Sequence, residues 1–92
     1  MRLKPGTESR AAALIEAGPP FDPTSLGLSR HRVFLSAGEA VFVFEGHQVE
    51  WAVDDLVSDP NAWATHEAFE AWRPLVESAP RIARQAYAWE ET

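Results

Sequence analysis

Residues 30–46 of the chain, RHRVFLSAGEAVFVFEG, decide its fold. Aromatic and β-branched residues follow one another on both sides of a short central segment, SAGE, which is typical of two strands joined by a tight turn. Within the turn we expect Gly38 to adopt a positive φ, a conformation that glycine tolerates better than other residues. The sequence therefore predicts an antiparallel hairpin around which the rest of the chain is arranged.

Both faces of this hairpin are apolar. In the second strand Phe42 and Phe44 point to one side, because side chains alternate along a strand. Val41 and Val43 point to the other side. A sheet with one face in water would alternate apolar with polar residues, so both faces of this sheet need cover. Helices of the same chain can cover one face, but a chain of 92 residues has little left for the second. We therefore expect a homodimer formed through the sheet.

Length and composition are those expected of a single small soluble domain, residues 1–92. Apolar residues make up 46% of the chain and charged residues 24%, close to the average for globular proteins. The net charge of −6 argues against binding to nucleic acid or to an anionic membrane, since both need a basic patch. The chain has no cysteine and no apolar run of about 18 residues, so we expect a cytoplasmic protein without disulfides or membrane spans.

The other segments of the chain predict helices, with a short strand at the start and a longer one at the end. Pro and Gly mark most of the boundaries between these segments. The expected elements are a few strand residues at 2–4, a helix after the N-cap Thr7, helices over 48–57 and 61–72, and a final strand over 85–91.

In chain order these elements predict an α+β fold. If the final strand returns beside the short first strand, the result is an antiparallel sheet with helices on one face. This is the split β-α-β arrangement of the ferredoxin-like class, with a first strand that is short or missing.

The pattern resembles the dimeric α+β barrel superfamily, which includes antibiotic-biosynthesis monooxygenase-like and stress-responsive barrel domains. The resemblance covers nearly the whole chain and rests on RLKPG at residues 2–6, on the hairpin, and on YAWE at residues 87–90 as the closing strand. It implies that two sheets pack face to face across a dimer. The superfamily mixes small oxygenases, isomerases, haem-degrading enzymes and members of unknown function, so the resemblance does not assign an activity.

Histidine and aromatic side chains are the candidates for a binding pocket. His66 lies three residues from both Trp63 and Phe69, which puts the three side chains on one side of the predicted helix. The alternative for His66 is a half-buried imidazole bonded to backbone or water. HEAFE at residues 66–70 is not the HExxH zinc motif, and we expect neither a metal nor a cofactor. The candidate pocket residues are His66, Trp63, His31, Tyr87 and Trp89.

Two classes of function remain open at this point. The first is a non-enzymatic homodimer that binds a small apolar or aromatic ligand or a protein partner. The alternative is a cofactor-independent monooxygenase-like or isomerase-like enzyme for an aromatic small molecule, in which His66, His31 or Tyr87 assists proton transfer. The first class is favoured because no two polar side chains can be brought together from the sequence pattern.

Overall fold

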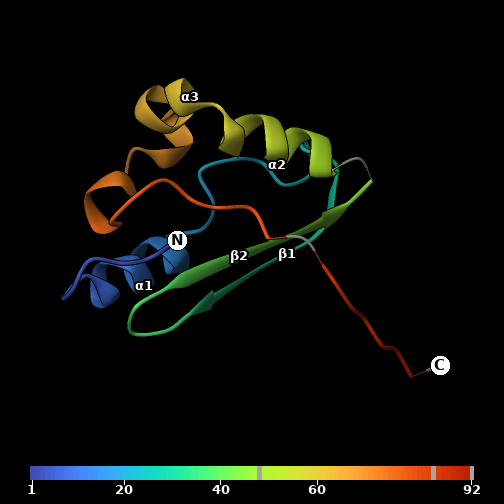
Figure 1. Ribbon diagram of the computed structural model, residues 1–92, viewed down its shortest axis with the longest axis horizontal. Coiled ribbons are helices and arrows are strands. Elements are labelled where there is room, and N and C mark those ends of the chain that lie inside the picture. Colours follow the sequence, from blue (N-terminus) through green and yellow to red (C-terminus); the bar gives the residue numbers. More distant parts are fainter. Residues whose placement is uncertain (48, 84, 92) are drawn as a thin grey trace.

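The computed structural model describes residues 1–47, 49–83 and 85–91, and for residues 50 and 52 it describes the backbone alone. Its architecture is α+β, with an open two-stranded antiparallel sheet and helices packed against it (Figure 1). The strands are β1 (Leu28–Leu35) and β2 (Ala40–Gly46). The helical elements are α1 (Glu8–Ala17), α2 (Val49–Ser58), α3 (Pro60–Thr65) and the 3-10 turns η1 (Glu67–Phe69) and η2 (Arg73–Leu75).

β1 and β2 form the predicted hairpin. One face of the hairpin turns toward the helices and carries the pairs His31–Phe44, Val33–Phe42 and Leu35–Ala40. The opposite face carries the pairs Arg30–Glu45, Arg32–Val43 and Phe34–Val41. We call this second face the open face, because the helices of the described residues leave it uncovered.

The turn of the hairpin differs from the prediction, because Gly38 is not among the glycines with a positive φ. The Ser36 N–H closes the turn by donating to the Glu39 carbonyl over 2.9 Å. The Gly38 carbonyl accepts a hydrogen bond from the Leu3 N–H, also at 2.9 Å. Pairing with the N-terminal segment therefore fixes the turn in a conformation for which glycine is not required.

The N-terminal segment forms the predicted short strand, in the form of single antiparallel bridges on both of its sides. Arg2 is bridged to Glu39 at the start of β2, and Leu3 is bridged to Val76 after η2. Backbone hydrogen bonds of 2.8–2.9 Å accompany both bridges. The segment therefore joins the hairpin to a part of the chain that lies far away in the sequence.

These bridges give the spatial order Val76, Leu3, β2, β1, which is compatible with a ferredoxin-like arrangement. The chain does return beside its first strand, but at Val76 and not over residues 85–91. Residues 85–91 form no strand, and they run out from the body of the molecule (Figure 1). The prediction of the final strand was wrong because the buried neighbour of Leu3 is the short apolar pair Leu75–Val76.

The first two helices lie close to their predicted positions. α1 buries Ala11 completely and packs Leu14 and Ile15 against the core, as the apolar stripe predicted. The hydroxyl of Thr7, the expected N-cap, makes no capping bond. Its single proton can reach the Lys4 carbonyl at 2.7 Å or the Leu75 carbonyl at 3.2 Å. Residue 48, where the second helix was predicted to begin, lies outside the described residues.

The predicted helix over residues 61–72 is divided into shorter pieces. α3 ends at Thr65 because His66 has an extended conformation, with φ −68° and ψ 131°. The turns η1 and η2 follow it. The Arg73 guanidinium donates to the carbonyls of Trp63 and His66, both over 2.6 Å, and so satisfies backbone groups near the break.

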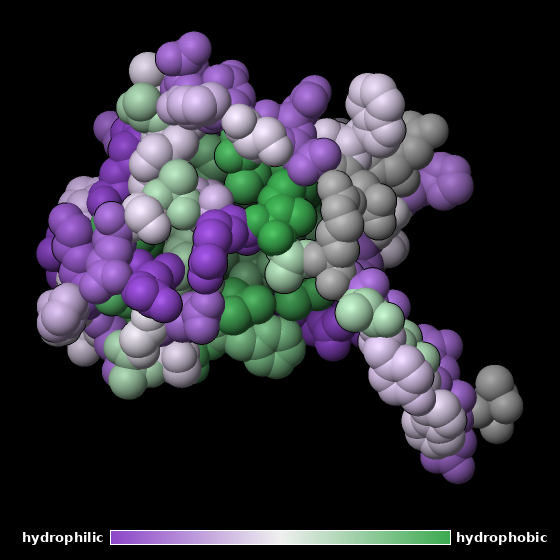
Figure 2. Space-filling model, viewed as in Figure 1, coloured by the Kyte–Doolittle hydropathy of each residue, from purple (hydrophilic) through white to green (hydrophobic). Residues whose placement is uncertain are grey.

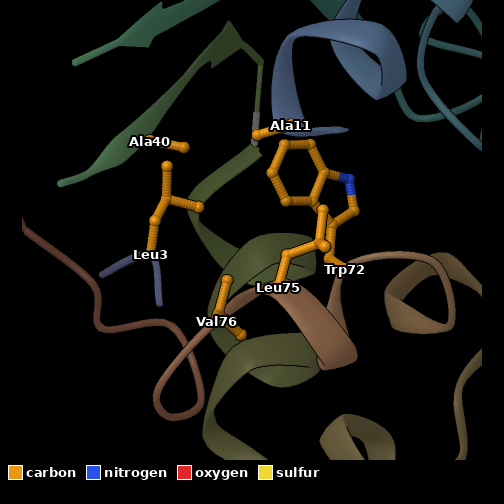
Figure 3. Packing of buried hydrophobic residues seen from close by; sticks show 6 residues of the cluster. All are labelled: Leu3, Ala11, Ala40, Trp72, Leu75 and Val76. Atoms are coloured by element: carbon orange, nitrogen blue, oxygen red, sulfur yellow. The ribbon is translucent and has the colours of Figure 1, made fainter. Parts of the chain in front are cut away.

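The core lies where these separate segments meet. Figure 3 shows its side chains pointing toward one another from the N-terminal segment, α1, β2 and the region of η2. Trp72, 6% exposed, packs edge-on against Phe42, with ring centroids 5.1 Å apart. The buried residues of this cluster are Leu3, Ala11, Ala40, Trp72, Leu75 and Val76.

Gly46 at the end of β2 leads to a first testable prediction. A Cβ on Gly46 would lie 3.0 Å from the Leu28 Cα and closer still to the Gly27 carbonyl oxygen, and both atoms belong to the backbone. Gly46→Ala is therefore expected to lower the free energy of unfolding by about 1–3 kcal/mol in urea denaturation, because backbone must move. Gly38→Ala is the matched control, since nothing lies within 4 Å of a Cβ there. Equal losses in the two variants would contradict this prediction.

Candidate functional site

The structure brings together part of the predicted pocket. The rings of Trp63 and Phe69 lie 5.1 Å apart, and the imidazole of His66 is 6.2 Å from the Phe69 ring. His31 lies on the sheet, and Tyr87 and Trp89 lie in the projecting segment. The five candidates therefore do not line one pocket.

His66 has a structural partner in the backbone. The side chain is exposed, and its Nδ1 accepts a hydrogen bond of 3.0 Å from the Ala68 N–H, so that the imidazole caps η1. His66 also borders a shallow, open depression between α2 and α3, together with Asp55, Leu56, Asp59 and Ala62. The Asp59 carboxylate accepts from the Asn61 N–H over 2.9 Å and so caps α3. Two of the polar groups at this depression thus cap the N-terminal ends of helical segments.

His31 belongs to a row of rings on the covered face of the hairpin. Its ring lies 4.6 Å from that of Phe44 and 5.6 Å from that of Phe21, measured between centroids. Its Nδ1 is 3.0 Å from the Val43 carbonyl oxygen, so the Nδ1–H tautomer donates to that carbonyl. The half-buried imidazole thus ties the two strands together.

The open face of the hairpin is an apolar surface that the described helices do not cover. Phe34 and Val41 pair across the strands, and they are 55% and 45% exposed, respectively. Val43 beside them is half-buried. Apolar residues reach the surface over the hairpin in Figure 2. The sequence pattern predicted an apolar face here, and alternation along the strands is the signal that places Phe34 on it. Phe34 was not among the candidate site residues.

Charged side chains occupy the other end of the open face. The Glu45 carboxylate lies 3.6 Å from the guanidinium groups of both Arg30 and Arg32. The Arg32 guanidinium carbon lies 6.0 Å from the centre of the Phe34 ring, within the range of a cation–π contact. Two guanidinium groups therefore share one carboxylate, which gives this end of the face a local positive charge in a chain whose net charge is −6.

Two further findings concern only the part of the chain that the structure describes. No group of three or more His, Cys, Asp or Glu side chains there is arranged to hold a metal ion. No described helix combines the length and apolarity needed to cross a membrane.

The fold and the open face define a small α+β domain with an exposed apolar sheet surface. Comparison of the chain with protein families, with curated proteins and with solved structures finds no match in any of the three.

Proposed function

We propose that this chain is a non-enzymatic interaction domain that works as a homodimer, with the open faces of two copies packed against each other. The observation that carries the proposal is the exposed pair of Phe34 and Val41 in the middle of a regular hairpin. An apolar strand pair in water is unfavourable, and burying a large apolar side chain fully contributes about 1.5–3 kcal/mol. A second copy of the chain carries the same exposed apolar pair, so two copies can bury these side chains against each other.

The charges on the open face support a two-fold arrangement. In a two-fold interface the same patch occurs on both sides, so each charged group needs a group of opposite charge within the same patch of the other copy. Arg30 and Arg32 flank Glu45 on each copy. Each copy therefore carries both signs of charge at the edge of the apolar patch, and the guanidinium groups of one copy can pair with the carboxylate of the other.

The order of the segments supports a ferredoxin-like sheet in each subunit, and two such sheets face to face would give the dimeric α+β barrel. Between the sheets the apolar side chains of the open face would line the space. A small apolar or aromatic ligand would bind there, at Phe34, Val41 and Val43. The alternative of an enzyme would use His66, His31 or Tyr87, and these three lie apart: the His66 imidazole caps η1, His31 lies on the sheet, and Tyr87 lies in the projecting segment.

The oligomeric state of Phe34→Glu tests this proposal. Sedimentation equilibrium at micromolar concentration is expected to give a dimer for the wild type. Phe34→Glu is expected to weaken self-association by at least about 30-fold, the effect of a hot-spot residue. Leu26→Glu is the control, since Leu26 is an exposed apolar residue in the turn before β1 and belongs to neither strand of the sheet. A wild type that stays monomeric, or a Phe34→Glu variant that dimerises as well as the control, would overturn the proposal.

A further inference from the structure

We infer that residues 85–91 of one copy add as a strand to the open edge of β1 in the second copy, so that the two subunits exchange their C-terminal segments. The inference rests on the proposed homodimer and specifies its partner segment. It joins three observations: an edge strand that has a strand partner on one side alone among the described residues, a projecting segment with a strand pattern, and a sheet face too small to hold a dimer by itself.

The first observation is the open edge of β1. The sheet of the described residues has two strands, so β1 pairs with β2 on one side alone. In an antiparallel pair, residues alternate between those that exchange hydrogen bonds with the partner and those whose N–H and C=O point away. The Ser36–Glu39 bond fixes this alternation. It follows that the backbone groups of His31, Val33 and Leu35 point to the outer edge.

An edge of this kind is a template for another strand. The outer edge of β2 already pairs with another segment of the chain. The Ala40 N–H, which points away from β1, donates to the Met1 carbonyl over 2.8 Å. At the opposite edge of the same sheet, β1 offers the equivalent groups over most of its length.

The second observation is the projecting segment, QAYAWEE at residues 85–91. Tyr87 and Trp89 are 81% and 73% exposed, which is far more than large aromatic side chains usually are in a folded domain. Residues of this type favour strands, and alternation puts them on one face with Ala86 and Ala88 on the other. The segment runs outward from the body of the molecule (Figure 1).

The two faces of the segment fit the two faces of β1. With Tyr87 and Trp89 on the open face, they extend the apolar surface of Phe34. Ala86 and Ala88 then lie on the covered side, where α1 contacts β1. Alternation also puts Glu91 on the same face as the two aromatic rings, toward the guanidinium groups of β1. The acidic end of the segment thus complements the positive charge on this strand.

The third observation is the small area of the open face. β2 is 7 residues long, and a two-stranded ribbon of this length offers about 250 Å² per copy at the usual rise and strand spacing. Two such faces fall well short of the roughly 1,200–2,000 Å² buried in a stable interface. Buried aromatic side chains contribute about 150–250 Å² each. The Tyr and Trp of two exchanged segments bring the total to the lower end of that range.

The test combines oligomeric state with amide hydrogen exchange on the full-length chain. Ala88→Pro is chosen because proline removes an N–H and disfavours strand pairing. Ala88→Val is the matched control, since valine keeps the N–H and favours a strand. In the wild type and in Ala88→Val we expect a dimer with slow amide exchange at His31, Val33 and Leu35. In Ala88→Pro we expect the dissociation constant of the dimer to be higher by about 10-fold or more. We also expect faster exchange at these amides.

The possible results separate the strand exchange from the proposed homodimer. A dimer that survives Ala88→Pro with unchanged exchange at β1 would overturn the strand exchange and leave the face-to-face dimer standing. A monomeric wild type whose β1 amides lose protection in Ala88→Pro would mean that the segment pairs within its own chain, which overturns both. A monomeric wild type with no effect of proline would also overturn both.

Discussion

Replacing Trp72 with alanine is expected to lower the free energy of unfolding by about 3–5 kcal/mol, the usual cost of removing a large buried aromatic side chain. Trp72 is the largest side chain of the buried cluster and is 6% exposed. Its ring also lies edge-on to that of Phe42 at 5.1 Å, so its loss exposes the covered face of the hairpin. A loss of this size is a large part of the total stability of so small a domain.

Trp51→Ala is the matched control for this prediction. Trp51 lies on α2 and is 79% exposed, so its removal takes away little buried surface. Urea denaturation of both variants, followed by circular dichroism, is expected to show a change of no more than about 0.5 kcal/mol for the control. If Trp72→Ala were as stable as Trp51→Ala, the assignment of the core around Trp72 would be wrong.

The hairpin and the first helix were predictable from the sequence because their signals are local and repeated. Alternation over residues 40–45 specifies two faces, and the stripe of Ala11, Leu14 and Ile15 specifies one helical side. The same local reasoning failed for residues 61–72. Their apolar spacing fits one helix, but His66 is extended and the carbonyls near the break bond to the Arg73 side chain. A contact from a side chain to backbone carbonyls leaves no periodic signal in the sequence.

The ends of the chain show a second limit of prediction. Residues 85–91 have a strand pattern but no strand partner among the described residues. An alternating pattern indicates that a segment can form a strand, but it does not indicate which strand is its partner. Residues 2–4 are too short to give a periodic signal, yet they pair on both sides. The same limit applies to the candidate pocket residues: His66 lies at the end of α3, whereas Tyr87 and Trp89 lie in the projecting segment.

We expect the second large loss of stability from a substitution at Leu3. Leu3→Ala should lower the free energy of unfolding by about 2–5 kcal/mol, the range for a buried leucine. The reason is its position, since Leu3 is buried between the start of β2 and Val76 and belongs to the same cluster as Trp72. A cavity at Leu3 removes packing from the hairpin on one side of the N-terminal segment and from Val76 on the other.

Two comparisons make this prediction specific. Leu26→Ala removes the same atoms from an exposed leucine and is expected to change stability by no more than about 0.5 kcal/mol in the same urea titration. The double variant Leu3→Ala/Val76→Ala should lose less than the sum of the two single losses, with a coupling of about 0.5–3 kcal/mol, because the two side chains are in one cluster. Strict additivity would mean that the N-terminal segment does not hold Val76 in place. Such a coupling is expected because the bridge from Leu3 to Val76 joins the N-terminal segment, which is itself bridged to the hairpin, to the segment after η2.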